Sequence, residues 1–280
     1  MKRLLNIELQ KLWKNRASKV LILTYFILLS FIALLASVNF KIIGIDFRLA
    51  DQGIFNFPYI WHFNTWIAAI LKLFLAIVIV SMMANEYTYG TLKQNLIDGL
   101  SKKEFIQSKV LTVILFAFGS TVFIFIMTLI LGYSFSSYTE ASIVFSDLQY
   151  IGAYFIKLVA FFSFCLFIGI LIKRSAFAIG FIFVWFIAEK IIEGLLWGFV
   201  ITKKEILNQY MQFFPLESMS NLIKEPISRF QLYKALESQA TAGQVNVKDY
   251  GVHWYQIAIV LVWTAFFIFM SYRTLKNRDL

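Results

Sequence analysis

Long runs of residues without a charged side chain constrain this sequence more than any other feature. The clearest runs extend from Val20 to Phe40, from Val110 to about Ser134 and from about Trp254 to Tyr272. A helix needs about 20 mostly apolar residues to cross the roughly 30 Å of hydrocarbon in a bilayer. Two further runs contain one lysine each, and a sixth meets three charged residues near its end. The pattern predicts six membrane-spanning helices, at about residues 20–40, 60–84, 110–134, 150–172, 175–201 and 254–272.

The composition agrees with that prediction. Only 15% of the residues are charged, whereas a soluble domain carries about 25%. We therefore expect an all-α integral membrane protein with one transmembrane domain over residues 1–280. The single Cys165 excludes an internal disulfide, and two histidines leave no Cys/His set for structural zinc. The formal net charge of +10 indicates cationic loops at an anionic membrane face rather than nucleic-acid binding.

The basic residues predict the orientation. The two chain ends and the loops after spans two and four carry 15 lysines and arginines, against 8 in the other loops. Short cytoplasmic segments are enriched in these residues, so both termini should be cytoplasmic. Ahead of the first span, one helical face carries Leu5, Leu9, Leu12 and Trp13. This face indicates an interfacial helix, and a merely basic anchor tail is an equal alternative.

The loop between spans two and three contains two capping boxes, in which an N-cap hydroxyl pairs with a side chain three residues later. The pairs are Thr91 with Gln94 and Ser101 with Glu104. Gly99 would end the first helix, because it lacks a Cβ and tolerates the left-handed C-cap conformation. One side of this helix is lined by Leu92, Leu96 and Leu100. A helix of two turns does not persist alone in water, so the bilayer surface or a partner should hold it.

The spacing of this loop resembles the cytoplasmic loop of ABC-2 type transporter permeases. That family has a Glu-x3-Gly-Thr sequence and then a proline, where this chain has Gly99, and an arginine, where it has Lys102. The resemblance implies that the short helix docks into a groove on an ATPase subunit and transmits its motion into span three. The coupling residues implied are Glu86, Gly90, Thr91, Leu92, Leu96, Gly99, Ser101, Lys102 and Lys109.

The resemblance also implies partners and a location. No Gly-x4-Gly-Lys-Ser/Thr phosphate loop occurs in the sequence, so ATP and Mg would be bound by a separate ATPase, in two copies. The chain itself would be no enzyme, and it would form an exporter with a second permease copy or a paralogue among the lipids of a bacterial cytoplasmic (inner) membrane. The cargo stays open. The alternatives are an ATP-independent carrier or channel, and a non-transporting anchor for a cytoplasmic partner.

Besides Lys157, which lies near a helix end, four charged residues fall within the predicted spans, and a charge costs about 2.5 to 3.5 kcal/mol at a helix centre. They are Lys72, Glu189, Lys190 and Glu193. One hypothesis is a polar patch facing a translocation cavity or a subunit interface, with Lys190 reaching Glu193 and Lys72 pairing with Glu189. The alternative is that span five ends near Ala188 and residues 189–202 form an interfacial or re-entrant helix.

Two further expectations concern the outer side. Lys157, near the start of span four, should extend its side chain outward to the interface. The outer loop 202–253 should be partly helical and pack over the outer mouth, with one short amphipathic helix carrying Phe230, Tyr233 and Leu236.

Overall fold

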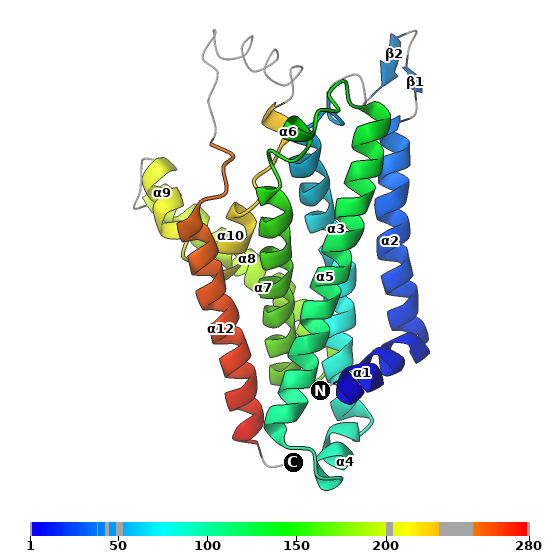
Figure 1. Ribbon diagram of the computed structural model, residues 1–280. Helices are drawn as coiled ribbons and strands as arrows, with labels where there is room; N and C mark the ends of the chain where they lie inside the picture. The colour runs from blue at the N-terminus through cyan, green and yellow to red at the C-terminus, as the bar shows by residue number, and fades with distance from the viewer. Residues whose placement is uncertain are drawn as a thin grey trace.

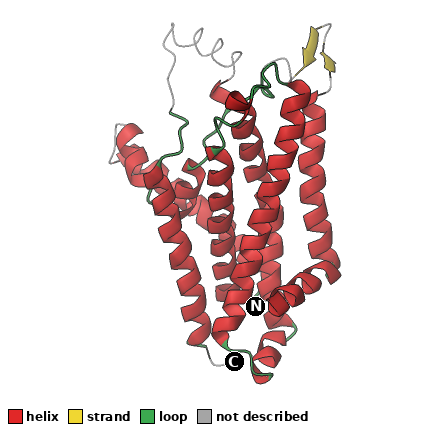
Figure 2. Cartoon of the chain, viewed as in Figure 1, coloured by secondary structure: helices red, strands yellow, loops and turns green. Residues whose placement is uncertain are grey.

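The computed structural model describes residues 2–37, 39–42, 45–48, 53–199, 204–229 and 249–278, and these are almost entirely helical (Figure 2). The long helices are α2 (Arg16–Ser37), α3 (Tyr59–Thr88), α5 (Lys102–Phe135), α7 (Gln149–Ile172), α8 (Ser175–Phe199) and α12 (Trp254–Lys276). The short elements are α1 (Lys2–Lys14), β1 (Asn39–Ile42), β2 (Ile45–Arg48), α4 (Thr91–Ile97), α6 (Ala141–Val144), α9 (Lys204–Met211), α10 (Pro215–Asn221) and the 3₁₀ helix η2 (Ile227–Arg229).

The long helices run side by side in one bundle (Figure 1). Helices α1 and α4 and both chain ends lie at one end of the bundle, which we call the α4 end. The β1–β2 hairpin and α6 lie at the opposite end, which we call the hairpin end. The α7 helix packs against α3, α5, α8 and α12 and is therefore the centre of the bundle.

Among the residues that the structure describes, five stretches are long and apolar enough to cross a membrane: α3, α5, the segment Ala141–Ile172 that contains α7, α8 and α12. The chain is thus a multi-pass helical membrane protein. The predicted first span ends too late, because α2 stops at Ser37 and Asn39–Ile42 form a strand antiparallel to Ile45–Arg48. Strands also favour aromatic and β-branched residues, so hydropathy alone does not separate the last helical turn from β1.

The α8 helix is continuous through its three charged residues, from Ser175 to Phe199. No break separates residues 189–199 from the rest of the helix, so they do not form a separate re-entrant segment. The predicted helical segment between spans five and six is present as α9, α10 and η2. The helix expected around Phe230, Tyr233 and Leu236 lies outside the described residues.

The centre of the bundle combines apolar packing with one polar contact. The α7 helix is apolar on nearly all sides, which is typical of a helix surrounded by others. Its Tyr154 hydroxyl lies 2.7 Å from the Tyr25 hydroxyl of α2 and 2.8 Å from the Ser120 hydroxyl of α5. All three groups are buried. They satisfy one another, so three helices are joined and none of these three hydroxyls is left unpaired.

The α1 helix is amphipathic, as predicted, and crosses the α4 end at an angle to α2 (Figure 1). Leu12 is buried, while Leu5 and Leu9 are partly buried. Trp13 is exposed, and the Lys19 ammonium lies 5.0 Å from the centre of its ring. The apolar side of α1 therefore faces the bundle, whereas Trp13 points away from it.

Candidate functional site

Four charged side chains meet at the α4 end, and we call them the ion-pair cluster: Glu8, Lys11, Glu86 and Lys109. The Lys109 ammonium of α5 lies 2.5 Å from a Glu8 oxygen and 2.6 Å from a Glu86 oxygen. Lys11 approaches the same carboxylates at 3.4 and 2.9 Å. The Lys109 side chain is 0% exposed. Buried charges are tolerated only when paired, so the cluster holds α1, α3 and α5 together through mutual compensation.

The cluster contains two carboxylates and two ammonium groups, so its charges balance. Partial burial lowers the pKa of Lys11, but the Glu8 and Glu86 carboxylates outweigh burial and hold that pKa above its usual value. Lys11 therefore stays protonated at neutral pH and supplies the second positive charge of the cluster, beside the buried Lys109.

The α4 helix is attached to this cluster by Thr91. The Thr91 hydroxyl donates to the second Glu86 oxygen at 2.6 Å. The N-cap is Gly90, in the left-handed region at φ +66°, and no side chain caps the helix there. The predicted capping box of Thr91 with Gln94 is therefore wrong, because the stronger acceptor, the Glu86 carboxylate, takes the hydroxyl. The result joins α4 directly to α3.

The far end of α4 closes as predicted. Gly99 has φ +95°, and the backbone N–H of Leu100 donates to the Asn95 carbonyl at 3.0 Å. This bond, together with one from Gly99 to Leu96 at 3.2 Å, forms a Schellman motif. Leu92 is buried, and Leu96 and Leu100 pack against the same core. The expectation that the bilayer or a partner must hold this helix is wrong, since the chain's own bundle holds it.

The opposite side of α4 is open. Ile97 is 77% exposed, and Lys93 and Gln94 are also exposed. We call these three residues the α4 outer face. Tyr89, which is 73% exposed, precedes the helix and lines a hollow beside α1 together with Lys11 and Thr91. An exposed apolar side chain beside a cation and an amide is suited to contact with another protein.

The remaining predicted coupling residues belong to the start of α5. Ser101 and Glu104 form the predicted capping box, which is confirmed. The Lys102 ammonium donates to the backbone carbonyls of Lys276 and Arg278, at 3.1 and 2.8 Å. Lys102 thus binds the C-terminal segment of its own chain. The structure brings Glu86, Thr91 and Lys109 together but directs Lys102 elsewhere.

In α8, Glu189 serves the neighbouring α10 helix. One carboxylate oxygen accepts the Trp185 indole N–H at 2.8 Å and the backbone N–H of Leu216 at 3.1 Å. The other accepts the backbone N–H of Glu217 at 3.0 Å. These N–H groups are in the first turn of α10, where no intrahelical acceptor exists. An anion there also complements the helix dipole. Glu189 is therefore the cap of α10, supplied by another helix.

We predict that Glu189→Ala lowers the free energy of unfolding by about 1 to 2 kcal/mol, the usual cost of losing a helix cap. Glu189→Gln should cost less, because the amide oxygen still accepts one of the two backbone bonds. Chemical unfolding in detergent micelles, followed by tryptophan fluorescence, measures both. Equal stability of the alanine variant and the wild type would refute the capping role.

Next to this cap, Lys190 of α8 binds Glu193 at 2.7 Å and Glu217 at 3.0 Å. The contact with Glu193 was predicted from their spacing and is confirmed. The contact with Glu217 could not be predicted from spacing, because α10 is brought there by the fold. Three predicted intramembrane residues thus have partners in α8 and α10.

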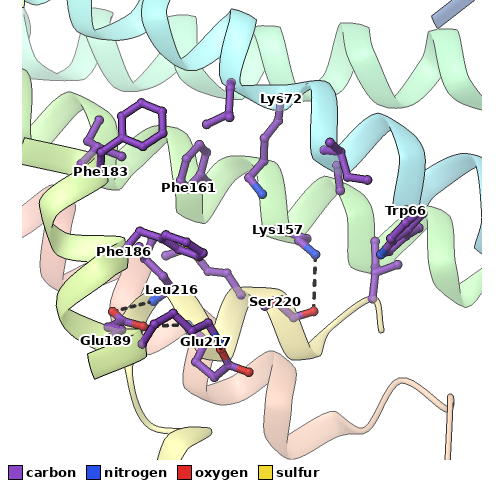
Figure 3. Close-up of a pocket in the computed structure, with 17 residues that line it drawn as sticks. Trp66, Lys72, Lys157, Phe161, Phe183, Phe186, Glu189, Leu216, Glu217 and Ser220 are labelled. Carbon is purple, nitrogen blue, oxygen red and sulfur yellow. Dashed lines mark hydrogen bonds and ion pairs between the residues drawn. The ribbon is translucent and has the colours of Figure 1, made fainter. Parts of the chain in front are cut away.

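A cavity of about 450 Å³ lies between α3, α7, α8 and α10 (Figure 3). Lys72 of α3 and Lys157 of α7 both point into it. The Lys72 ammonium lies 4.7 Å from the centre of the Phe161 ring. Lys157, which is 4% exposed, donates to the Ser220 carbonyl at 3.4 Å. The expected outward path of Lys157 is therefore wrong, because the cavity accommodates its side chain.

Lys72 and Glu189 both line this cavity, as their similar depth predicted. In the part of the chain that the structure describes, however, the two make no ion pair within 4.0 Å, since Glu189 is taken up by α10. Two residues at the same depth in the membrane can still point in different directions around their helices, so equal depth does not predict that they pair.

Sequence reasoning did not assign Glu8 and Lys11 to the ion-pair cluster, or Lys157 to the cavity. Glu8 carried a usable signal, because it lies on the apolar stripe between Leu5 and Leu12. An acid on a buried stripe requires a partner. Lys157 carried no such signal, because one lysine near a helix end fits snorkelling equally well.

The described residues contain no group of three or more His, Cys, Asp and Glu side chains that could hold a metal ion. His62 is buried at the hairpin end, where it stacks on Tyr150 with 4.3 Å between ring centres. One ring nitrogen lies 2.8 Å from the Lys224 carbonyl and the other 3.1 Å from the Arg229 guanidinium. Both nitrogens are occupied, so His62 connects α3 to the segment before α12.

Comparison with known proteins gives a family for this bundle. No curated protein matches the chain. Residues 59–280, from the start of α3 to the last residue, match the family described as protein of unknown function (DUF2705). Because this match covers most of the chain, the protein belongs to the DUF2705 family.

Proposed function

We propose that this protein is the membrane-spanning permease subunit of an ATP-driven ABC exporter, of the ABC-2 type, whose ATPase is a separate chain. The observation that carries the proposal is the way α4 is mounted. Its inner side is attached to the bundle through Thr91 and Leu92, and its outer face exposes Ile97. A short helix with one fixed and one open side is suited to receive force from a partner.

The ion-pair cluster supports this role mechanically. Glu86 contacts Thr91 of α4, Lys109 of α5 and Lys11 of α1. A push on α4 would therefore reach α3, α5 and α1 through hydrogen bonds and ion pairs, and Lys109, which is among them, is fully buried. Transmission of motion needs such packed, hydrogen-bonded connections between rigid elements.

The proposal includes a sixth span and a sidedness. The 22-residue α2 is about 33 Å long at 1.5 Å per residue, enough for the hydrocarbon core. Six crossings would place both termini on one side, in agreement with their common position at the α4 end. The basic residues make that side cytoplasmic in a bacterial inner membrane. Two copies, or one copy and a paralogue, would enclose the pathway, with two ATPase copies bound below.

The test is purification of the tagged chain from its native membrane. We expect an ATPase with a phosphate-binding loop to be recovered at one copy per chain, with ATP hydrolysis by the complex. Ile97→Asp should reduce recovery of this ATPase at least tenfold, because a charge replaces an apolar contact at the interface centre. The free energy of unfolding of the Ile97→Asp variant should stay within about 0.5 kcal/mol of that of the wild type, since the Ile97 side chain is exposed.

The matched control is Ile97→Val, which keeps an apolar side chain and should retain the ATPase. Leu96→Asp is a poor test, because Leu96 packs against the core and its loss would disturb α4 itself. Unchanged ATPase recovery with Ile97→Asp would refute docking through the α4 outer face. Transport driven by an ion gradient without ATP would establish a carrier, and a stable complex that moves no cargo would establish an anchor.

A further inference from the structure

The cavity between α3, α7, α8 and α10 holds two ammonium groups that lack a carboxylate partner. Among the described residues, neither Lys72 nor Lys157 has an acidic oxygen within 4.0 Å. The carboxylates that line the cavity are occupied, Glu189 by the N–H groups of α10 and Glu217 by Lys190. Neither ammonium group therefore has an ion-pair partner at the cavity wall (Figure 3).

The bonds that these lysines do make are few. An ammonium group has three donors. Within the described ranges, Lys157 uses one, at the long distance of 3.4 Å to the Ser220 carbonyl, and Lys72 contacts the face of the Phe161 ring without a hydrogen bond. Isolated charges deep in a bundle are costly and face a cavity or a partner as a rule. An anion bound between the two lysines would supply the missing acceptors.

Apart from the two lysines and the polar residues Glu189, Lys190, Glu217 and Ser220, the cavity wall is apolar. Its aromatic and aliphatic members include Trp66, Phe161, Phe183, Phe186, Leu216 and Met219. A volume of about 450 Å³ lies within the usual range for small-molecule sites, about 300 to 1,000 Å³. A small hydrated anion alone would not fill such a cavity. A ligand that matches the apolar wall carries an apolar body attached to its charged head.

The position of the wall residues indicates where the ligand enters. Ile70 and Leu73 of α3 and Phe183 and Phe186 of α8 line the cavity and are also exposed on the outside of the bundle. The cavity therefore borders the lateral surface between α3 and α8, which in a membrane faces lipid. A molecule from the bilayer would reach the lysines without passing through water.

From these observations we propose that the cavity binds an anionic amphiphile, a lipid-like molecule whose phosphate or carboxylate head lies between Lys72 and Lys157. Its apolar body occupies the aromatic part of the wall. Binding needs no ATPase, whereas export of the bound amphiphile rests on the proposed function.

The test uses the purified chain in detergent and Trp66 as a probe, because this residue lines the cavity. Phosphatidylglycerol with brominated acyl chains quenches nearby tryptophan and is compared with brominated phosphatidylcholine, which has the same chains and no net charge. The quenching lost in Trp66→Phe isolates the contribution of the cavity. We expect brominated phosphatidylglycerol to reach half-maximal quenching of Trp66 at a concentration at least tenfold lower than brominated phosphatidylcholine does.

The double variant Lys72→Gln/Lys157→Gln should abolish this preference, leaving the two lipids equal. Lys14→Gln removes a charge from the exposed side of α1 and should leave the preference unchanged, which controls for general attraction of anionic lipid. Each single glutamine variant, with unfolding measured alongside, separates loss of binding from loss of fold.

Three results would overturn the proposal. The first is equal quenching of Trp66 by the two lipids in the wild type. The second is an unchanged preference in the folded double variant. The third is release of phosphatidylglycerol by millimolar inorganic phosphate as effectively as by unbrominated phosphatidylglycerol, since the site would then take the anion alone. Because all three are measured without an ATPase, they are independent of the Ile97→Asp result.

Discussion

Lys109→Met is expected to lower the free energy of unfolding by about 3 to 5 kcal/mol, the usual cost of removing one partner from a buried ion pair. The substitution preserves side-chain length and apolar packing but leaves the Glu8 and Glu86 carboxylates facing each other without their buried cation. Lys11 compensates only in part, because its side chain is 38% exposed and lies farther from Glu8. Chemical unfolding in detergent micelles measures the loss.

The control for this prediction removes the whole cluster of buried charge. In the triple variant Glu8→Gln/Glu86→Gln/Lys109→Met the ion-pair cluster keeps only the charge of Lys11, whose side chain is 38% exposed, so we expect much of the lost stability to return. Replacing a complete buried ion pair with neutral residues is often nearly neutral, unlike breaking it. A triple variant no more stable than Lys109→Met would mean that the cluster acts through packing and not through charge.

Gly132→Ala is expected to destabilise the protein by about 1 to 3 kcal/mol, as overpacking of a core does. A Cβ at Gly132 of α5 would lie 2.2 and 2.4 Å from two ring carbons of Phe57. This ring is buried and packs beside Trp61, with 5.9 Å between ring centres, so it has little space to move. Thermal unfolding in detergent measures the effect.

The same helix offers a matched control. Gly119 also lies within α5, but a Cβ there would meet nothing within 4 Å. Gly119→Ala should therefore leave stability unchanged or raise it by up to about 1 kcal/mol through helix propensity. Combining Gly132→Ala with Phe57→Leu should recover part of the loss, because the two positions share one volume. Additive losses in the double variant would show that the clash is relieved elsewhere.

The local features of this chain could be predicted from its sequence because they depend on neighbouring residues. Apolar runs predicted the positions of the long helices. The Ser101–Glu104 capping box predicted the start of α5, and Gly99 predicted the end of α4. The Lys190–Glu193 pair followed from helical spacing. Each depends on residues no more than a few helical turns apart.

The errors concern residues that compete for partners across the fold. Thr91 was expected to cap its own helix, but Glu86 from the preceding helix takes its hydroxyl. Glu189 was expected to pair with Lys72, but its carboxylate accepts two backbone N–H groups of α10 instead. A helical pattern gives the depth of a side chain, whereas its partner depends on how neighbouring helices are rotated and on which donors they bring.

The sequence by itself determined that this chain is a helical membrane protein, since the free energy of placing a segment in hydrocarbon is summed over its own residues. Only the tertiary structure decided which charges are paired and which are left facing a cavity. Lys109 and Glu8 are 101 positions apart, and nothing in the local pattern of either residue specifies the other. Charge compensation in a low-dielectric interior is a property of the assembled bundle.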